Sequence, residues 1–134
     1  MEKKIPRISS ELRRHVVEVP KSAFSSSGIV IFGHRIKSLV FTTDIAIIRN
    51  CNADAVLAVY PFTPQQVISS ALITASYSPV FCGVGGGTTG GDRVVMLARD
   101  AEALGAMAVV VNAPIQDDVV RQMRRVVDIP IVCT

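Results

Sequence analysis

The hydrophobic positions of the chain fall into short apolar runs that alternate with longer amphipathic segments. The apolar runs predict strands at residues 39–43, 55–60, 79–84, 108–111 and 129–133. The segments between them predict helices at residues 44–50, 64–75, 92–104 and 116–127. Within the strand runs apolar and polar residues do not alternate, which indicates that both faces of the sheet are buried. The pattern therefore predicts an α/β fold with a parallel sheet and right-handed βα crossovers.

Two helix boundaries carry their own sequence signals. Thr63 is a good N-cap, and Pro64 fits the first helical position. Gln66 stands three residues after Thr63, at the position where a capping box has Glu or Gln. These residues predict a helix that begins at Pro64 and runs to about Ala75. Gly105 is the expected C-terminal stop of the helix at residues 92–104.

The N-terminal segment differs from the rest of the chain. Residues 1–27 form a basic arm that ends in a Ser-rich stretch, with a short helix or arm expected around residues 10–17. Strand-like runs at residues 28–32 and 38–42 flank residues 33–35, and the first run is expected to be a hairpin arm or plug before the main sheet. We therefore divide the chain into an arm at residues 1–27 and a βα-repeat domain at residues 28–134.

Two architectures fit the predicted elements. One is a five-stranded doubly wound sheet of the flavodoxin-like kind. The other is part of a (β/α)8 barrel. The short repeat, roughly 22–28 residues per βα unit, favours the barrel. The apolar fifth strand ends the chain with no helix to cover it, so we expect a truncated barrel made of the first five strands, completed by further chain or by another copy.

The segment from Ser78 to Thr134 carries a resemblance to known barrels. It has a strand, a glycine loop, a helix that ends in Ala-x-x-x-Gly-Ala at residues 101–106, and then a strand Ala-Val-Val-Val. This arrangement resembles the family of dihydrodipicolinate synthase and N-acetylneuraminate lyase. It is also similar to the phosphate-binding barrels, which include the glycerol-operon antiterminator regulators. The resemblance implies the (β/α)8 fold.

One departure from the lyase family concerns its Schiff-base lysine, which lies on a late barrel strand. The lysines of this chain are Lys3, Lys4, Lys21 and Lys37, and all of them precede the first main strand. The resemblance therefore does not bring pyruvate-type aldolase chemistry to these residues.

Composition narrows the function classes. The chain has 134 residues, of which 49% are hydrophobic and 19% charged, and this excludes an intrinsically disordered protein. A net charge of +3 with 5% aromatic residues argues against a nucleic-acid-binding domain. No apolar run approaches the ~18 residues needed to span a bilayer, so we expect no membrane association.

The three cysteines, Cys51, Cys82 and Cys133, are odd in number and lack metal-ligand spacing. They predict free thiols in a reducing compartment, so we expect a cytoplasmic protein with neither metal nor cofactor.

Candidate site residues follow from the strand ends, which converge on one rim in both architectures. Asp44 and Asn112 directly follow strands and are candidate catalytic residues, with an N-cap role for Asp44 and a turn role for Asn112 as the alternatives. His34, between Gly33 and Arg35, is a candidate acid or base, with a hairpin turn as the alternative. Tyr60 and Cys133 also lie at strand ends.

The glycine loop is the strongest local signal. Six glycines lie within residues 83–91, where backbone N–H groups can approach a ligand and the next helix begins. The loop fits neither the Walker pattern nor the dinucleotide-binding pattern. We expect it to bind a phosphate or carboxylate through Gly85, Gly86, Gly87, Thr88, Thr89, Gly90, Arg93 and Thr43, with a tight strand–helix connection or a mobile lid as the alternatives.

These features predict a barrel-type enzyme, a lyase, isomerase or hydrolase, that acts on a small anionic metabolite and forms a homo-oligomer. Two alternatives remain open at this point. One is a non-catalytic metabolite-sensing or regulatory barrel whose basic arm contacts RNA or a partner. The other is a structural domain that forms oligomers.

Overall fold

The computed structural model describes residues 16–87 and 89–134 as seven strands, four α-helices and one short 3-10 helix. In chain order the elements are η2 Lys21–Ser25, β1 Ile29–Ile31, β2 His34–Ile36, β3 Leu39–Phe41, α1 Ile45–Arg49, β4 Ala55–Ala58, α2 Gln66–Ala75, β5 Val80–Gly86, α3 Gly91–Leu104, β6 Ala108–Asn112, α4 Asp117–Val126 and β7 Ile131–Cys133. The expected helix or arm around residues 10–17 lies mostly outside the described residues. Its last residue, Val17, makes an isolated parallel bridge with Cys51.

The main sheet is parallel and its strands follow one another in chain order, β3-β4-β5-β6-β7. A flavodoxin-like sheet would change direction between its strands, because its order is 2-1-3-4-5. A barrel adds each new strand to the same side of the previous one. The prediction of a partial barrel is therefore confirmed, and the doubly wound alternative is wrong.

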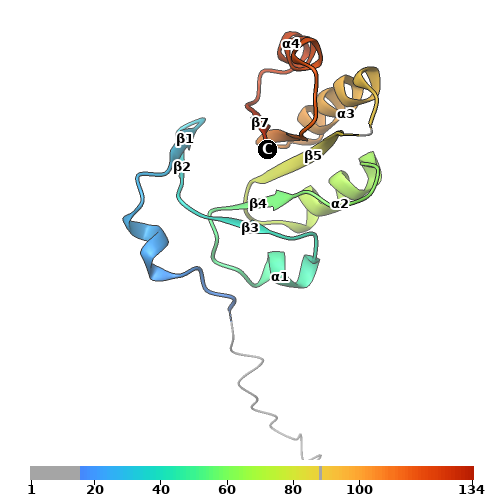
Figure 1. Ribbon diagram of the computed structural model, residues 1–134. Helices are drawn as coiled ribbons and strands as arrows, with labels where there is room; N and C mark the ends of the chain where they lie inside the picture. The colour runs from blue at the N-terminus through green and yellow to red at the C-terminus, as the bar shows by residue number, and fades with distance from the viewer. Residues whose placement is uncertain (1–15, 88) are drawn as a thin grey trace, which may run out of the picture.

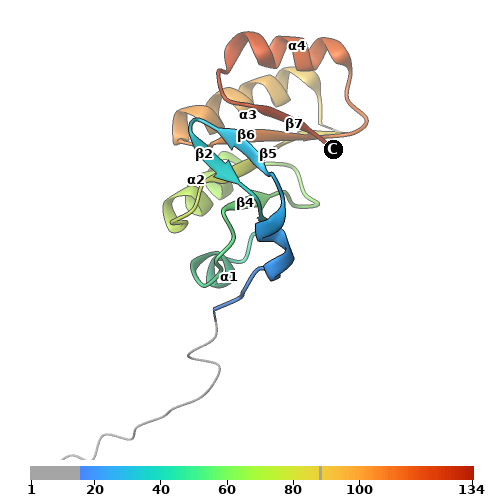
Figure 2. The same cartoon turned by 90° about the vertical axis from the view of Figure 1, so that its left-hand side faces the viewer.

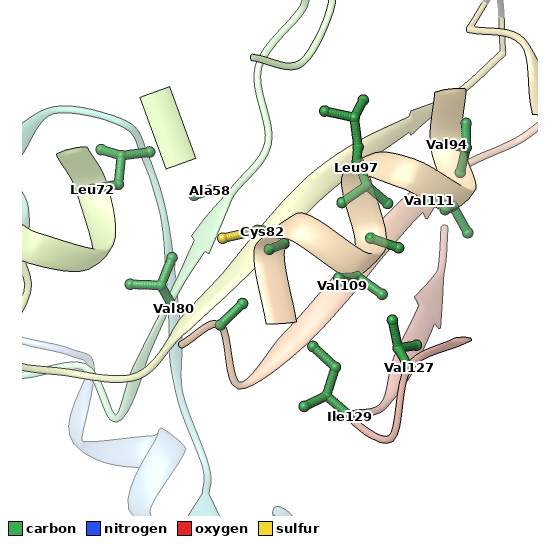
Figure 3. Close-up of a cluster of buried hydrophobic side chains, with 14 of the residues drawn as sticks. Ala58, Leu72, Val80, Cys82, Val94, Leu97, Val109, Val111, Val127 and Ile129 are labelled. Carbon is green, nitrogen blue, oxygen red and sulfur yellow. The ribbon is translucent and has the colours of Figure 1, made fainter. Parts of the chain in front are cut away.

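All four α-helices cover the same face of the sheet (Figure 1). Right-handed crossovers that always advance in one direction place every helix on that face. The larger hydrophobic core lies between the helices and the sheet, where Leu72, Leu97 and Ala98 meet Val80, Cys82 and Val109 (Figure 3).

The opposite face of the sheet carries the β1–β2 hairpin (Figure 2). Ile31 and Ile36 of the hairpin are buried in a second cluster with Ala55, Phe81 and Ala108, which lie at or near the starts of β4, β5 and β6. The expected plug before the main sheet is therefore present. Its second arm is formed by residues 34–36, where the sequence predicted a connection.

Helix α3 follows its sequence signals closely. It begins one residue before the predicted start, buries Val94, Leu97, Ala98 and Ala101, and ends at Gly105. Gly105 has φ 102° and its N–H donates to the carbonyls of Ala101 and Glu102. A left-handed residue at this position closes the last turn, which is why glycine ends the helix.

Helix α2 begins two residues later than predicted, and its N-cap is Gln65 instead of Thr63. A capping Thr63 would need its hydroxyl to accept the N–H of Gln65 or Gln66. The N–H of Gln65 instead donates to Tyr60 Oη, at 3.0 Å. This contact from outside the helix replaces the local cap, so the capping-box prediction is wrong.

Strand β5 extends two residues past its predicted end, through Gly85 and Gly86. Both glycines pair with β6, opposite Val111 and Asn112, after a register shift between Gly83 and Gly85. The first part of the expected glycine loop is therefore strand, because the low strand propensity of glycine is outweighed by pairing with a buried neighbour.

We predict that burial of Cys82 makes stability fall at alkaline pH. Burial raises the pKa of this thiol from 9.0 to about 11, and a hydrogen bond with Ser69 opposes part of the shift. The unfolded chain loses the thiol proton near pH 9, whereas the folded chain retains it until pH 11. The free energy of unfolding should therefore decrease between these values by up to about 3 kcal/mol.

The measurement is urea unfolding from pH 8 to 11, compared with Cys82→Ala. The variant should have a lower stability at pH 8 and a shallower decrease above pH 9. Parallel pH curves for the two proteins would contradict the prediction.

We also predict that the 134-residue chain binds a hydrophobic dye at edge strand β3, on the face of the sheet that carries the β1–β2 hairpin. Leu39 and Phe41 pair with Ala55 and Leu57 of that face, yet they are 43% and 67% exposed. Apolar side chains gathered at a sheet edge provide a dye site. Phe41→Ser should reduce the fluorescence of the bound dye. Met96→Ser, which removes an exposed apolar residue of α3, should leave it unchanged. A wild-type protein that causes no increase in dye fluorescence would refute the prediction.

Candidate functional site

A pocket of about 560 Å³ lies where β4, β5 and β6 end. These three strands are neighbours in the parallel sheet, so their C-terminal ends lie side by side (Figure 1). We call this cavity the rim pocket. It is lined by Val59, Tyr60, Pro61, Phe62, Thr63, Pro64, Gly83, Gly85, Gly86, Gly87, Thr89 and Asn112.

Backbone conformation and close packing require the glycines of the rim pocket. Gly85, Gly86 and Gly87 all have positive φ, at 118°, 102° and 61°. A Cβ placed on Gly86 would lie 2.1 Å from the carbonyl oxygen of Asn112. Glycine at this position is therefore required for the close approach of β5 to β6, whether or not a ligand is bound.

The backbone N–H groups of the glycine segment are partly used by the protein itself. The N–H of Gly87 donates to Pro114 O at 2.9 Å, and the N–H of Thr89 donates to Gly86 O at 3.2 Å. These two groups are therefore not free for an anion. Helix α3 begins just beyond, at N-cap Gly90, and no side chain caps that end. Thr88 lies outside the described residues.

Asn112 is the predicted catalytic candidate that lies on the rim pocket. It ends β6, is half-buried and lines the rim pocket. Its Oδ1 accepts a hydrogen bond from Thr134 Oγ1 at 2.8 Å. The Nδ2 group of Asn112 offers two N–H donors to a ligand, and Oδ1 keeps a second lone pair.

Tyr60 also lines the rim pocket, and the sequence marked it only as a strand-end position without a role. Its Oη accepts the N–H of Gln65, so its own proton is available for a second hydrogen bond. It is the only titratable side chain among the described residues that line this pocket. The sequence signal for it is its place as the last residue of the strand predicted at residues 55–60.

Asp44 and Thr43 lie at the end of β3, outside the lining of the rim pocket. Asp44 is the N-cap of α1, and its Oδ1 accepts the N–H groups of Ala46 and Ile47 at 2.8 and 3.2 Å. This is the capping alternative given above for Asp44. The structure does not bring Thr43 or Asp44 together with the glycine segment.

His34 and Arg93 also lie away from the rim pocket. His34 begins β2 in the hairpin, which packs against the starts of the strands, and its side chain is exposed. Arg93 is exposed in the first turn of α3 and lines none of the pockets described. Of the predicted site, the structure therefore brings together Asn112, Thr89 and Gly85, Gly86 and Gly87.

A second cavity, of about 290 Å³, lies behind the glycine segment. Gly86, Gly87 and Thr89 separate it from the rim pocket, and Gly90 lines it at the start of α3. Ile115 and Val119 supply its apolar wall. The glycine segment is thus a thin partition with a cavity on each side.

Two kinds of feature are absent from the described part of the chain. No group of three or more His, Cys, Asp or Glu side chains in residues 16–87 and 89–134 is arranged to hold a metal ion. Among those same residues, no helix has the length and apolar character required to cross a membrane.

Comparison with known proteins supports the architecture. No protein-family model matches the chain, and no curated protein matches it in sequence. Solved structures do match, and among them is a crystal structure of dihydrodipicolinate synthase, with a TM-score of 0.56 and 17% sequence identity. The match covers 66% of this chain and 36% of that enzyme's chain, so the chain spans little more than a third of its length.

The fold is a partial (β/α)8 barrel. The strand order and the solved structure agree on this point, and the resemblance drawn from Ser78 to Thr134 is confirmed at the level of fold. In barrels of this kind ligands bind at the C-terminal ends of the strands. The rim pocket occupies that end.

We predict that Gly86→Ala destabilises the protein by more than about 2 kcal/mol, because Ala tolerates neither φ 102° nor the contact with Asn112 O. Gly90→Ala is the matched control, since a Cβ added there would have nothing within 4 Å and its φ is −63°. Its cost should stay within about 1 kcal/mol. Equal midpoints of urea unfolding for the two variants would contradict the assignment.

Proposed function

We propose that the rim pocket binds a small metabolite that bears a phosphate or carboxylate group, as the substrate site of a barrel-type enzyme of the lyase, isomerase or hydrolase kind. The proposal rests on one observation. Hydrogen-bond donors from the ends of three neighbouring strands surround the pocket, and no described residue in its lining has an acidic side chain.

The first donor is the side-chain amide of Asn112 at the end of β6. Its oxygen accepts a hydrogen bond from the hydroxyl of Thr134, and its nitrogen offers two N–H protons to a ligand. A carboxylate or phosphate oxygen is the natural partner for such a group, because charge-assisted hydrogen bonds are stronger than neutral ones.

The second and third donors come from the segments that follow β4 and β5. Tyr60 Oη already accepts the N–H of Gln65, which favours donation of its own proton to a ligand oxygen. Thr89 adds a hydroxyl from the segment that joins β5 to α3.

The chemistry that this lining offers is proton donation by a phenol. Asp44 caps a helix and His34 lies on the hairpin, so neither is positioned by this chain to act on a ligand in the rim pocket. Tyr60 is the titratable group that would exchange a proton with bound substrate. We therefore assign binding to Asn112 and Thr89, and both binding and proton transfer to Tyr60.

The small number of titratable groups also supports a second candidate, a non-catalytic barrel that senses the same kind of metabolite. A sensor needs donors that hold an anion but no acid–base pair, and the described lining provides donors with a single phenol. If the protein binds small phosphates or carboxylates but converts none of them to product, this candidate is favoured over the enzyme.

We predict that Asn112→Asp weakens anion binding by more than about tenfold. The substitution keeps the acceptor for Thr134 but replaces two donors with a negative charge. The measurement is isothermal titration calorimetry with inorganic phosphate and with malonate.

Asn52→Asp is the control for the change in net charge. Asn52 is exposed, does not line the rim pocket, and uses its Oδ1 to accept the N–H of Val19, which an aspartate also does. Its affinity for phosphate and malonate should equal that of the wild type. A wild-type protein that binds neither anion, or an Asn112→Asp variant that binds both unchanged, would refute the proposed site.

A further inference from the structure

The wall of the rim pocket opposite Asn112 is the connection between β4 and α2, residues 59–65. A hydrogen bond from the N–H of Gln65 to Tyr60 Oη, at 3.0 Å, joins the two ends of this connection. Pro61 and Pro64 restrict the backbone between them, and Pro64 is buried. The wall is therefore fixed before any ligand arrives.

Phe62 lies in the middle of this fixed connection. Its side chain is 74% exposed, yet it lines the rim pocket. Other large apolar residues of the described chain are also exposed, but Phe62 is the one among them that lines this pocket. A phenyl ring at the mouth of a binding pocket provides a flat apolar surface on which a ligand can stack.

The size of the rim pocket supplies an independent argument. Its volume of about 560 Å³ falls in the range of roughly 300–1,000 Å³ that is typical of pockets for drug-sized ligands. A phosphate ion or a three-carbon acid would fill only a small part of that space. The donors of Asn112 and Thr89 account for the anionic group, and the remaining space adjoins Phe62, Pro61 and the ring of Tyr60.

We propose that the ligand of the rim pocket is an aryl-bearing anion, which places its phosphate or carboxylate on Asn112 and Thr89 and stacks its ring on Phe62. This inference deepens the proposed function and rests on it. Phe62 then determines specificity: it does not hold the anionic group, but it distinguishes an aryl phosphate from phosphate itself. The fixed connection lowers the entropic cost of this contact, because the wall is already ordered.

The test compares two pairs of probes by calorimetry: phenyl phosphate with inorganic phosphate, and benzoate with acetate. We expect the wild type to bind each aryl probe at least about tenfold more tightly than its small partner, an effect typical of burying one aromatic ring. Phe62→Ser should remove this preference while the affinity for inorganic phosphate stays the same. Phe62→Tyr, which keeps the ring, should restore it.

The control for loss of an exposed phenyl ring is Phe32→Ser. Phe32 lies in the turn of the β1–β2 hairpin, is 65% exposed and does not line the rim pocket. This variant should keep the full preference for the aryl probes. Thermal unfolding of both variants checks that the fold is retained.

The possible results separate the two proposals. A wild type that binds phosphate and phenyl phosphate equally would overturn the inference about Phe62 and leave the anion site standing. A preference that survives Phe62→Ser would also overturn it, because another surface would then hold the ring. A wild type that binds none of the four probes would overturn the proposed function itself.

Discussion

The contact between the backbones of Gly86 and Asn112 is the constraint on which the rim depends. No side chain fits between the two strands at that point, because a Cβ on Gly86 would lie 2.1 Å from Asn112 O. The contact aligns the last residues of β5 and β6 and continues a register that has shifted between Gly83 and Gly85. It thereby holds the side-chain amide of Asn112 beside the segment that leads to Thr89. The glycines of this segment are explained first by packing, and the proposed ligand site depends on that packing.

The two faces of the sheet are covered by different elements, and the rim pocket lies at the end of the strands away from the hairpin. The helix face holds the larger core, in which Cys82, Val109 and Leu97 pack together (Figure 3). The opposite face is covered by the hairpin near the starts of the strands, while the rim pocket lies at the strand ends. The hairpin packing and the proposed ligand site therefore lie at opposite ends of the same strands, as is usual in barrel folds. Substitutions in the hairpin should affect mainly stability.

Local signals in the sequence predicted much of the fold. Helix α3 and its stop at Gly105 were predicted to within one residue, because the apolar spacing and the glycine cap are contained in the segment itself. The start of α2 was not, since a side chain outside the helix, Tyr60, bonds the N–H that a local cap would have used. The end of β5 was missed for a similar reason: glycines predict a loop, and only the neighbouring strand makes them part of the sheet.

The candidate site could be predicted only in part. The rule that ligands bind at strand ends led to Asn112 and Thr89, and the structure places both on the rim pocket. The same rule led to Asp44, but it could not show that the carboxylate faces the N–H groups of its own helix. The sequence offered no way to see that Phe62 and Tyr60 would share a wall, because this depends on how the connection between β4 and α2 is closed.

The position of the hairpin has a consequence for how the chain folds. Ile31 and Ile36 are buried against Phe81, Ala108 and Val110, which come much later in the chain. The hairpin can pack only after β5 and β6 have formed, and contacts between distant parts of a chain are slow to form. During synthesis on the ribosome the apolar residues of the hairpin would emerge before β5 and β6 and would stay exposed to solvent until those strands form. That interval is when the nascent chain is most prone to aggregate and has the greatest need of a chaperone.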